Sequence, residues 1–262
     1  MNYGLYLSAS GVLTNMYRQD VFANNLANVK TVGFKPDLPT IRQRAPESME
    51  DQLDFGVRKQ LLDRLGGGVL AGQQRIEQTQ GELTRTGNAL DVALTQPKMF
   101  FAVAQADAAT GQTAIHLSRD GRFGLNAEGE LIQVASGHRV LDTSDRPITL
   151  KPGVPATIDD AGRIMQDGAS VGRLQVVSVA DPDHLVKQGD NLLRMPDGTD
   201  TRQPVESPRL RSGYEEASAV DPIRTLMQVI EATKAVSANG NMIRYHDLVM
   251  DKAVNVLGRV IG

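Results

Sequence analysis

The sequence contains no cysteine, and this absence excludes several kinds of chemistry. Without a thiol the chain can form no disulfide bond, no thiolate metal site and no cysteine nucleophile. Aromatic residues make up 4% of the chain and tryptophan is absent, which argues against a carbohydrate-stacking cleft or a stacking platform for single-stranded nucleic acid. The formal net charge of -3 lacks the basic excess of a DNA-binding protein. We therefore expect no nucleic-acid partner.

Long hydrophobic runs are also missing. No stretch approaches the ~18 apolar residues of a membrane-spanning helix, so we expect no direct membrane span. The first residues, MNYGLYLSASGVL, have no basic region and no uninterrupted apolar core, and so do not resemble a cleavable signal peptide. If the protein leaves the cytoplasm, we expect a route that needs no cleaved leader.

Motifs for catalysis, cofactors and metals are absent too. The four histidines lie far apart, and none has a metal-ligand partner at helical spacing. The glycine-rich RLGGGVL lacks the Gly-Lys-Ser/Thr ending of a phosphate loop. Carboxylate pairs such as Asp159-Asp160 lie in predicted turns. The sequence predicts no catalytic residue, no cofactor and no metal site, although a hydrolase site assembled from separate loops stays open.

The first 28 residues carry the pattern of an amphipathic helix. It extends from Gly4 to Asn28 with apolar residues three, four and seven positions apart. This stripe could pack on the core of its own domain or on another helix. The residues that form it are Leu5, Ala9, Val12, Met16, Ala23 and Leu26.

A second, longer helix is predicted at the end of the chain. Asp221-Pro222 combines an N-cap acid with proline at the first helical position. Apolar residues then follow at intervals of seven, which favours a coiled-coil seam over the drifting stripe of a globular helix. The polar run Ser237 to Asn241 interrupts the stripe and predicts a kink or weak point. The seam consists of Val229, Val236, Ile243, Met250 and Leu257, widened by Leu226, Ile230, Ala253 and Val254.

Between the two helices, short apolar runs alternate with turn signals. This pattern predicts an all-β domain of ~8 to 12 short strands, arranged as a sandwich or barrel. Two hairpins are expected, with turns at Asn126 to Gly129 and around Asp160 to Gly162.

The predicted fold class is α+β, with terminal helices forming a coiled-coil-like helical domain around a central all-β domain. We expect four segments. These are an N-terminal helix at 1–35, an extended connector at 36–80, the β-rich domain at 81–213 and a C-terminal helix at 214–262.

Three asparagines, Asn24, Asn25 and Asn28, lie where the first helix is expected to end. An interfacial amide penalises wrong helix registers because it must find a matching partner, so these residues could align subunits. Asn28 could equally be the left-handed residue that ends the helix. Both roles are compatible, with Asn28 as the cap and Asn24 and Asn25 facing partners.

The stretch ANNLANVKTVGFK, Ala23 to Lys35, resembles the N-terminal signature of bacterial flagellar rod and hook proteins. Further segments match the family in order: GELTRTGNALDVAL, FFAV, SRDGRFGLNAEGELI and the closing DKAVNVLGRVIG. The length fits a rod subunit, and the resemblance favours a proximal over a distal rod protein. The chain departs from the family pattern at Lys98-Met99, at Ser218-Ala219-Val220 and at Lys234, Val236 and Ser237.

The resemblance implies a non-enzymatic structural subunit that polymerises through its terminal helices into the helical rod of the flagellar basal body. It implies export by the flagellar type III apparatus to the periplasmic space, with other rod subunits and hook-proximal proteins as partners. A cell-wall hydrolase and a soluble binding module are the alternatives. The expected assembly residues are Leu5, Val12, Met16, Asn24, Asn25, Leu26, Asn28, Gly33, Phe34, Val229, Val236, Ile243, Met250 and Leu257.

Overall fold

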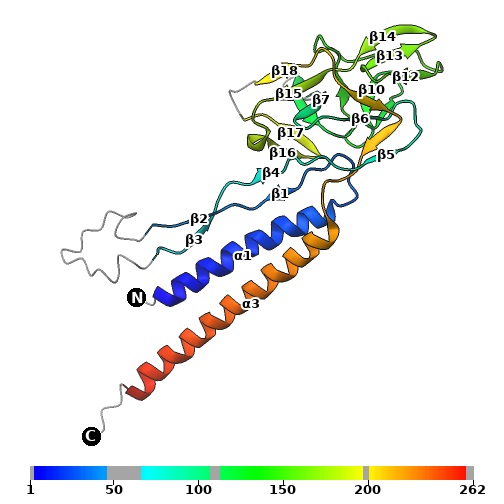
Figure 1. Ribbon diagram of the computed structural model, residues 1–262. Coiled ribbons are helices and arrows are strands. Elements are labelled where there is room, and N and C mark those ends of the chain that lie inside the picture. The colour runs from blue at the N-terminus through cyan, green and yellow to red at the C-terminus, as the bar shows by residue number, and fades with distance from the viewer. Residues whose placement is uncertain (1–2, 46–65, 107–112, 197–200, 258–262) are drawn as a thin grey trace. The chain divides into compact units, whose positions relative to one another are not determined.

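The computed structural model describes residues 3–45, 66–106, 113–196 and 201–257 (Figure 1). The chain divides into two compact units. The helical unit contains residues 1–27, 37–75 and 221–262, and the β unit contains residues 28–36 and 76–220. Helices near both ends and strands between them confirm the predicted α+β class. Residues 46–65 of the predicted connector lie outside the described residues.

The N-terminal helix α1 comprises Tyr3–Ala27, close to the predicted bounds. It ends at a turn in which the Thr31 backbone N–H donates to the Asn28 carbonyl oxygen at 3.1 Å. The Thr31 hydroxyl also donates to the Asn28 side-chain oxygen at 3.0 Å. The backbone of Asn28 does not adopt a positive φ. The expected left-handed cap is therefore wrong, because an ordinary turn closed by Thr31 ends the helix.

The C-terminal helix α3 comprises Pro222–Lys252 and continues as a π-helical turn, Ala253–Leu257 (η2). The predicted start is confirmed. The Asp221 carboxylate accepts hydrogen bonds from the backbone N–H groups of Ile223 and Arg224, at 3.0 and 3.1 Å. These two donors would otherwise lack an intrahelical acceptor. The helix is not interrupted at Ser237 to Asn241.

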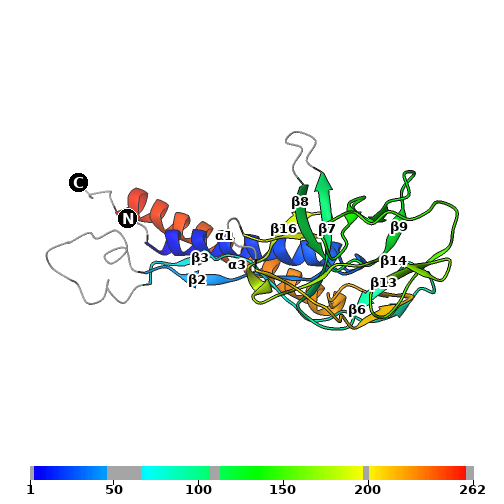
Figure 2. The same ribbon diagram turned by 90° about the horizontal axis from the view of Figure 1, so that it is seen from above.

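Helices α1 and α3 lie side by side within the helical unit (Figures 1 and 2). A Cβ atom placed on Gly4 would come within 2.6 Å of the His246 ring, and one on Gly11 within 2.8 Å of the Asn239 amide. Moving seven residues forward on α1 thus corresponds to moving seven residues back on α3, so the helices are antiparallel. Glycine at these positions lets the two backbones approach closely around polar side chains.

The face of α3 toward α1 has a seven-residue period. Thr225 and Ala232 are buried, and Asn239 and His246 follow at the same interval, half-buried. Val229, Val236 and Ile243, also half-buried, lie between them on the same face. Asn239 belongs to the polar run expected to weaken the helix. It contacts α1 instead, because the small Gly11 lies opposite.

Among its described residues the helical unit also contains three short strands: β1 (Asp37–Leu38), β2 (Ile41–Gln43) and β3 (Val69–Ala71). Strands β2 and β3 pair antiparallel and lie beside α1 (Figure 2). The Thr14 hydroxyl donates to the Val69 carbonyl at 3.4 Å, and the Tyr17 hydroxyl to the Gly72 carbonyl at 3.3 Å. Part of the predicted connector thus forms a two-stranded ribbon against α1.

The β unit is built from short strands. Residues 81–213 contain β5 to β19, more strands than the ~8 to 12 expected. Strand β4 (Arg75–Ile76) contains the boundary between the units. The other bounds are β5 Leu83–Arg85, β6 Val92–Leu94, β7 Met99–Ala106, β8 Thr113–Ser118, β9 Phe123–Leu125, β10 Leu131–Gln133, β11 Arg139–Val140, β12 Ala156–Ile158, β13 Arg163–Gln166, β14 Ala169–Arg173, β15 Val176–Val179, β16 Val186–Gly189, β17 Leu192–Arg194, β18 Arg202–Pro204, β19 Leu210–Ser212 and β20 Tyr214–Glu216, with a 3-10 turn, η1, at Pro182–His184.

The largest sheet has nine strands, with the order β16-β17-β8-β7-β11-β10-β9 and with β15 and β18 joined beside β7. Strand β7 lies at its centre and is buried on both faces. Phe101 and Val103 enter one apolar cluster, while Phe100 enters a second and Ala102 a third. Burial of both faces explains why this strand reads as a continuous apolar run in the sequence.

Both predicted hairpins are confirmed. Strands β9 and β10 pair antiparallel around a turn in which Gly129 has a φ of 80°. Strands β12 and β13 pair around a turn in which Gly162 has a φ of 77°. Glycine adopts these left-handed conformations at low cost, which is why the turns were visible in the sequence.

Candidate assembly surface and signature segment

The segment ANNLANVKTVGFK comprises the end of α1 and the first residues of the β unit. Asn25 is the buried asparagine of this segment and belongs to the helical unit. The side chain is 4% exposed. Its Nδ2 donates to the Asp37 carbonyl oxygen at 2.8 Å, and its Oδ1 accepts from the Asp37 backbone N–H at 2.9 Å. The Asn25 side-chain amide thus makes the same two kinds of hydrogen bond to the Asp37 backbone that a neighbouring β-strand would make. This intramolecular role replaces the subunit-facing role expected for Asn25.

The neighbouring positions are more open. The Asn24 side chain is exposed, whereas Leu26 and Asn28 are half-buried. Asn28 accepts the Thr31 hydroxyl within the turn after α1. The three asparagines therefore occupy three different environments, and Asn24 is the most exposed of them.

Gly33 belongs to the β unit and has a φ of 70°. A Cβ atom at this position would lie 2.6 Å from the Arg119 carbonyl carbon and 2.7 Å from the Asp120 nitrogen. Its backbone N–H donates to the Glu216 carbonyl oxygen at 2.7 Å. Both the dihedral angle and the close backbone approach require glycine.

Phe34 is 5% exposed and lies under the Lys187 amine, which is 3.8 Å from the centre of its ring. Its carbonyl oxygen accepts a hydrogen bond from the Ala219 backbone N–H at 3.1 Å. The cation and the apolar ring attract each other through the ring quadrupole. Phe34 is thus part of the interior of the β unit, where it anchors the signature segment.

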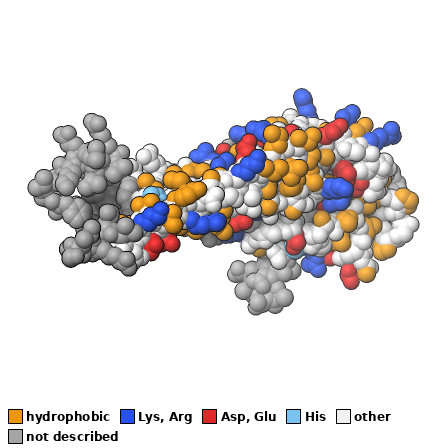
Figure 3. All heavy atoms as spheres, turned by 90° about the horizontal axis from the view of Figure 1, so that it is seen from below, with side chains coloured by type: hydrophobic (Ala, Val, Ile, Leu, Met, Phe, Trp, Pro, Cys, Tyr) orange, Lys and Arg blue, Asp and Glu red, His pale blue; other side chains and the backbone are white. Residues whose placement is uncertain are grey.

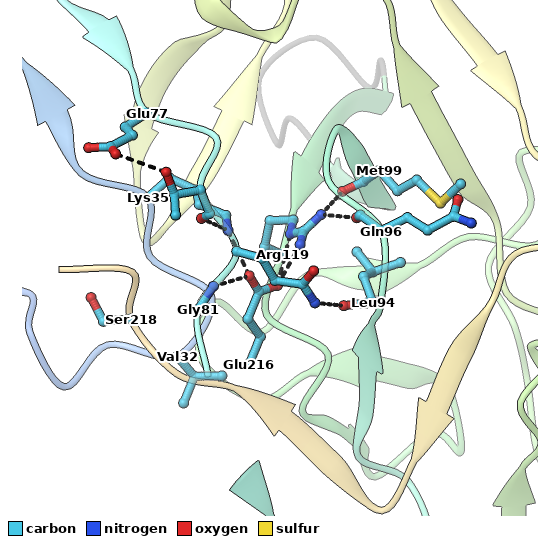
Figure 4. A network of polar contacts seen from close by, with 12 residues as sticks. Val32, Lys35, Glu77, Gly81, Leu94, Gln96, Met99, Arg119, Glu216 and Ser218 are labelled. Atoms are coloured by element: carbon cyan, nitrogen blue, oxygen red, sulfur yellow. Dashed lines mark hydrogen bonds and ion pairs between the residues drawn. The ribbon is translucent and has the colours of Figure 1, made fainter. Parts of the chain in front are cut away.

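Lys35, Arg119 and Glu216 form a buried ionic network (Figure 4). The Lys35 amine donates to Glu216 Oε1 at 2.6 Å and to the Thr79 carbonyl at 2.6 Å. Arg119 Nε donates to Glu216 Oε2 at 2.9 Å. The three side chains are at most 3% exposed. The Glu216 carboxylate is drawn between the two cations. It therefore joins Lys35, from the N-terminal part of the chain, to Arg119, which follows strand β8.

Backbone groups complete this network. Arg119 Nη1 donates to the carbonyl oxygens of Gln96 and Met99 at 2.9 and 2.8 Å. The Gly81 N–H donates to Glu216 Oε1 at 3.0 Å. Buried charges are stable when they are both paired and hydrogen-bonded, and this network meets both conditions.

Burial disfavours the charged form of both cations. It lowers the pKa of the Lys35 amine, and the neighbouring Arg119 charge lowers it further, while Glu216 opposes the change. Burial also lowers the pKa of Arg119, again opposed by Glu216. The shared carboxylate is therefore what keeps two like charges stable side by side.

The expected assembly residues on the helices fall on two kinds of surface. On α1, Leu5 and Met16 are 36% and 47% exposed, and Val12 is half-buried. On α3, Val229, Val236 and Ile243 lie on the face toward α1. Met250 is 47% exposed, and the side chain of Leu257 is outside the described residues.

Further hydrophobic side chains are exposed on both helices. On the face drawn in Figure 3 they lie along the helices among Lys and Arg side chains. An apolar surface of this extent is typical of a protein-interaction site. Those at least 45% exposed outside the expected set are Leu13, Ile223, Leu226, Met227, Ile230, Met242, Tyr245, Leu248, Val249 and Val254.

The described ranges contain neither a metal-binding cluster nor a membrane-spanning helix. Among them, no three His, Asp or Glu side chains are grouped to hold a metal ion. No helix among these residues is both long and apolar enough to cross a bilayer.

The sequence interpretation missed two groups of residues. Arg119, Lys35 and Glu216 were not identified, although the first two lie within motifs that were. The polar and small residues of the α3 seam, Thr225, Ala232, Asn239 and His246, were also missed. Their seven-residue spacing could have revealed these residues, because it has the same period as the apolar series, whose members Val229, Val236 and Ile243 lie on the same face.

Comparison with known proteins gives consistent matches. The family described as "Flagella basal body rod protein" matches residues 5–35. The chain is 32% identical to the flagellar basal-body rod protein FlgF of Caulobacter vibrioides, over 99% of this chain and 100% of that protein. It is 30% identical to the flagellar basal-body rod protein FlgG of Agrobacterium fabrum, over 93% and 95%. It is 27% identical to the flagellar hook-basal body complex protein FlhO of Bacillus subtilis, over 98% and 99%.

Proposed function

Because the chain belongs to the flagellar basal-body rod protein family, with FlgF among its full-length relatives, we propose that it is a rod subunit that polymerises through its terminal helices into a helical drive shaft. A head-to-tail interface that does not close on itself generates such a helical assembly. The family membership expected from the sequence is confirmed. The mode of polymerisation is the part that we propose.

The observation that carries this proposal is the antiparallel packing of α1 on α3. We infer that the two helices form a coiled coil, with α3 contributing positions from Thr225 to His246. Support comes from their alternation of three and four residues, which is the spacing of a coiled-coil seam. A helix pair with exposed apolar faces suits a subunit that packs against copies of itself and against related subunits.

The remaining parts of the proposal follow from the family. We propose export by the flagellar type III apparatus without a cleaved signal peptide, assembly in the periplasmic space and contacts with other rod and hook-proximal proteins. We also propose that the protein is not an enzyme, since the relatives carry the names of rod proteins. Release of muropeptides from peptidoglycan by purified protein would contradict this last point.

A deletion strain tests the proposed function. Deleting the gene should abolish swimming, and the intact gene should restore it. An epitope inserted in the 107–112 segment of the β unit should then label the rod in isolated basal bodies. Val236→Asp would place a charge in the proposed coiled coil and should prevent incorporation, whereas Val171→Asp, at an exposed β-unit position, should not. Swimming by the deletion strain, or label absent from basal bodies of the complemented strain, would refute the proposal.

A further inference from the structure

Helix α1 carries a second stripe on the side opposite α3. We name Leu13, Met16, Asp20, Ala23 and Ala27 the α1 outer stripe, and all five are exposed. Their spacings alternate between three and four residues. Asp20 lies nine residues after Gly11, which contacts α3, and nine residues correspond to two and a half helical turns. The stripe therefore points away from α3.

Helix α3 has a matching second stripe. We name Ile223, Met227, Ile230, Lys234, Ala238, Asn241 and Tyr245 the α3 outer stripe, and all are exposed. Lys234 follows the fully buried Ala232 by two residues, a rotation of about 200° around the helix. This stripe therefore points away from α1. A helix with two seams of the same period can contact two partners at once.

Each outer stripe has one charged residue at its middle, and the charges are opposite. Asp20 interrupts the α1 outer stripe and Lys234 the α3 outer stripe. Across the described part of the chain neither side chain forms an ion pair. The two residues cannot meet within one molecule, because each lies on the far side of its helix from the other helix. They can meet only between molecules.

An antiparallel alignment that places Asp20 beside Lys234 also matches the neighbouring side chains by size. Met16 then lies opposite Ala238, Ala27 opposite Met227, and Ala9, next to the stripe, opposite Tyr245. Each of these layers combines one large and one small side chain, which allows close packing. The Leu13 layer falls opposite Asn241 and adds no apolar pair.

We propose that the α1 outer stripe of one subunit docks antiparallel on the α3 outer stripe of a second copy of this chain, in the register fixed by Asp20 and Lys234. This inference rests on the proposed function and names the surface and the partner that it uses. Because α1 and α3 already contact each other within each subunit, repeated docking produces a continuous layer of alternating α1 and α3 helices. The paired charges disfavour shifted registers, since a shift by one heptad would place Asp20 opposite Met227 or Asn241 and Lys234 opposite Leu13 or Ala27, without a counter-charge.

Engineered cysteines test the register directly, because the natural chain has none. In the strain that lacks the natural gene, Met16→Cys combined with Ala238→Cys should yield disulfide-linked multimers in isolated basal bodies after oxidation. Met16→Cys combined with Glu231→Cys, two helical turns out of register, should yield none. Linked multimers from the second variant and not from the first would overturn the proposed register.

Charge exchange tests the pairing. Asp20→Lys and Lys234→Asp should each abolish swimming, while the double exchange should restore it. Glu128→Lys and Lys151→Asp, at exposed positions of the β unit, serve as controls and should leave swimming unchanged. Swimming by both single variants, or no recovery in a double variant whose circular dichroism matches the natural protein, would overturn the pairing. Absence of the natural subunit from basal bodies would instead refute the proposed function.

Discussion

The side-chain amide of Asn25 forms two hydrogen bonds with the backbone of Asp37, at 2.8 and 2.9 Å. The amide thereby acts as the backbone of a paired strand would. The contact joins the last turn of α1 to the strand that follows the signature segment. The amide thus fixes the path of the chain after the helix, which explains why an asparagine is needed at a buried position.

Asn25→Ala should lower the free energy of unfolding of the helical unit by about 2–4 kcal/mol, because it removes both hydrogen bonds between the buried Asn25 amide and the Asp37 backbone. Urea unfolding followed by circular dichroism measures the change. Asn24→Ala is the matched control and should alter stability by less than about 0.5 kcal/mol, since its side chain is exposed. Equal losses in both variants would argue against the special role of Asn25.

Glu216→Gln should destabilise the β unit by roughly 3–5 kcal/mol, because Lys35 and Arg119 would remain buried without their shared counter-charge. Glutamine keeps the size of the side chain, so the loss reports charge and not volume. Glu215→Gln, one residue away and half-buried, should have a much smaller effect. If the two variants unfold at the same urea concentration, the network does not stabilise the unit.

Two glycines have nearly the same φ but different surroundings. Substituting each of them therefore distinguishes the cost of backbone strain from the cost of a steric clash. Gly33 has a φ of 70° and Gly137 a φ of 71°. An added Cβ atom would lie within 3 Å of backbone atoms at Gly33, whereas at Gly137 it would have nothing within 4 Å. Gly137→Ala should cost about 1–2 kcal/mol from the left-handed conformation alone. Gly33→Ala should cost clearly more, and thermal unfolding of the two variants tests the difference.

Two helical glycines should respond with opposite signs. Gly240→Ala on α3 should stabilise the protein by about 0.5–1 kcal/mol, because alanine favours helix and no atom lies near its Cβ position. Gly11→Leu on α1 should destabilise the helical unit, because the side chain would collide with Asn239. Stabilisation by both substitutions would show that the close approach at Gly11 is not needed.

Stability should decrease with acid below about pH 6.5, where histidine ordinarily titrates. His116 is 2% exposed, and within the described residues its ring nitrogens form no hydrogen bond. Burial lowers the pKa of its imidazole, and His138 and Arg194 lower it further. As the pH falls below about 6.5, the unfolded chain therefore binds this proton before the folded chain does, and the free energy of unfolding decreases until the folded pKa is passed. His116→Leu should flatten this dependence in urea unfolding between about pH 7 and 5, and an unchanged slope would contradict the assignment.

The sequence predicts best those features that depend on neighbouring residues. Asp221-Pro222 marks the start of α3, and the glycines at 129 and 162 mark the hairpins, because caps and turns form over a few residues. The period of seven on α3 was also visible. Val229, Val236 and Ile243 of the predicted seam lie on the face toward α1, but Asn239 and His246 on the same face were not predicted, because the expected seam was apolar.

Long-range partners could not be predicted in the same way. Nothing near Glu216 in the sequence shows that its carboxylate binds Lys35, because the choice of partner depends on the complete fold of the β unit. The motif containing Lys35 was recognised by resemblance. The structure explains its lysine, because the amine pairs with the buried carboxylate of Glu216, near the other end of the chain.

The separation of 181 residues between Lys35 and Glu216 has a consequence for the order in which the protein folds. Contacts between distant parts of a chain form slowly, because the intervening segment must first be closed into a loop. A chain that emerges gradually from its N-terminus cannot complete this ion pair until more than four-fifths of its length has emerged. Until then the Lys35 amine lacks the Glu216 carboxylate that pairs with it in the interior. Completion of the β unit is therefore a late event in the folding of the newly made chain.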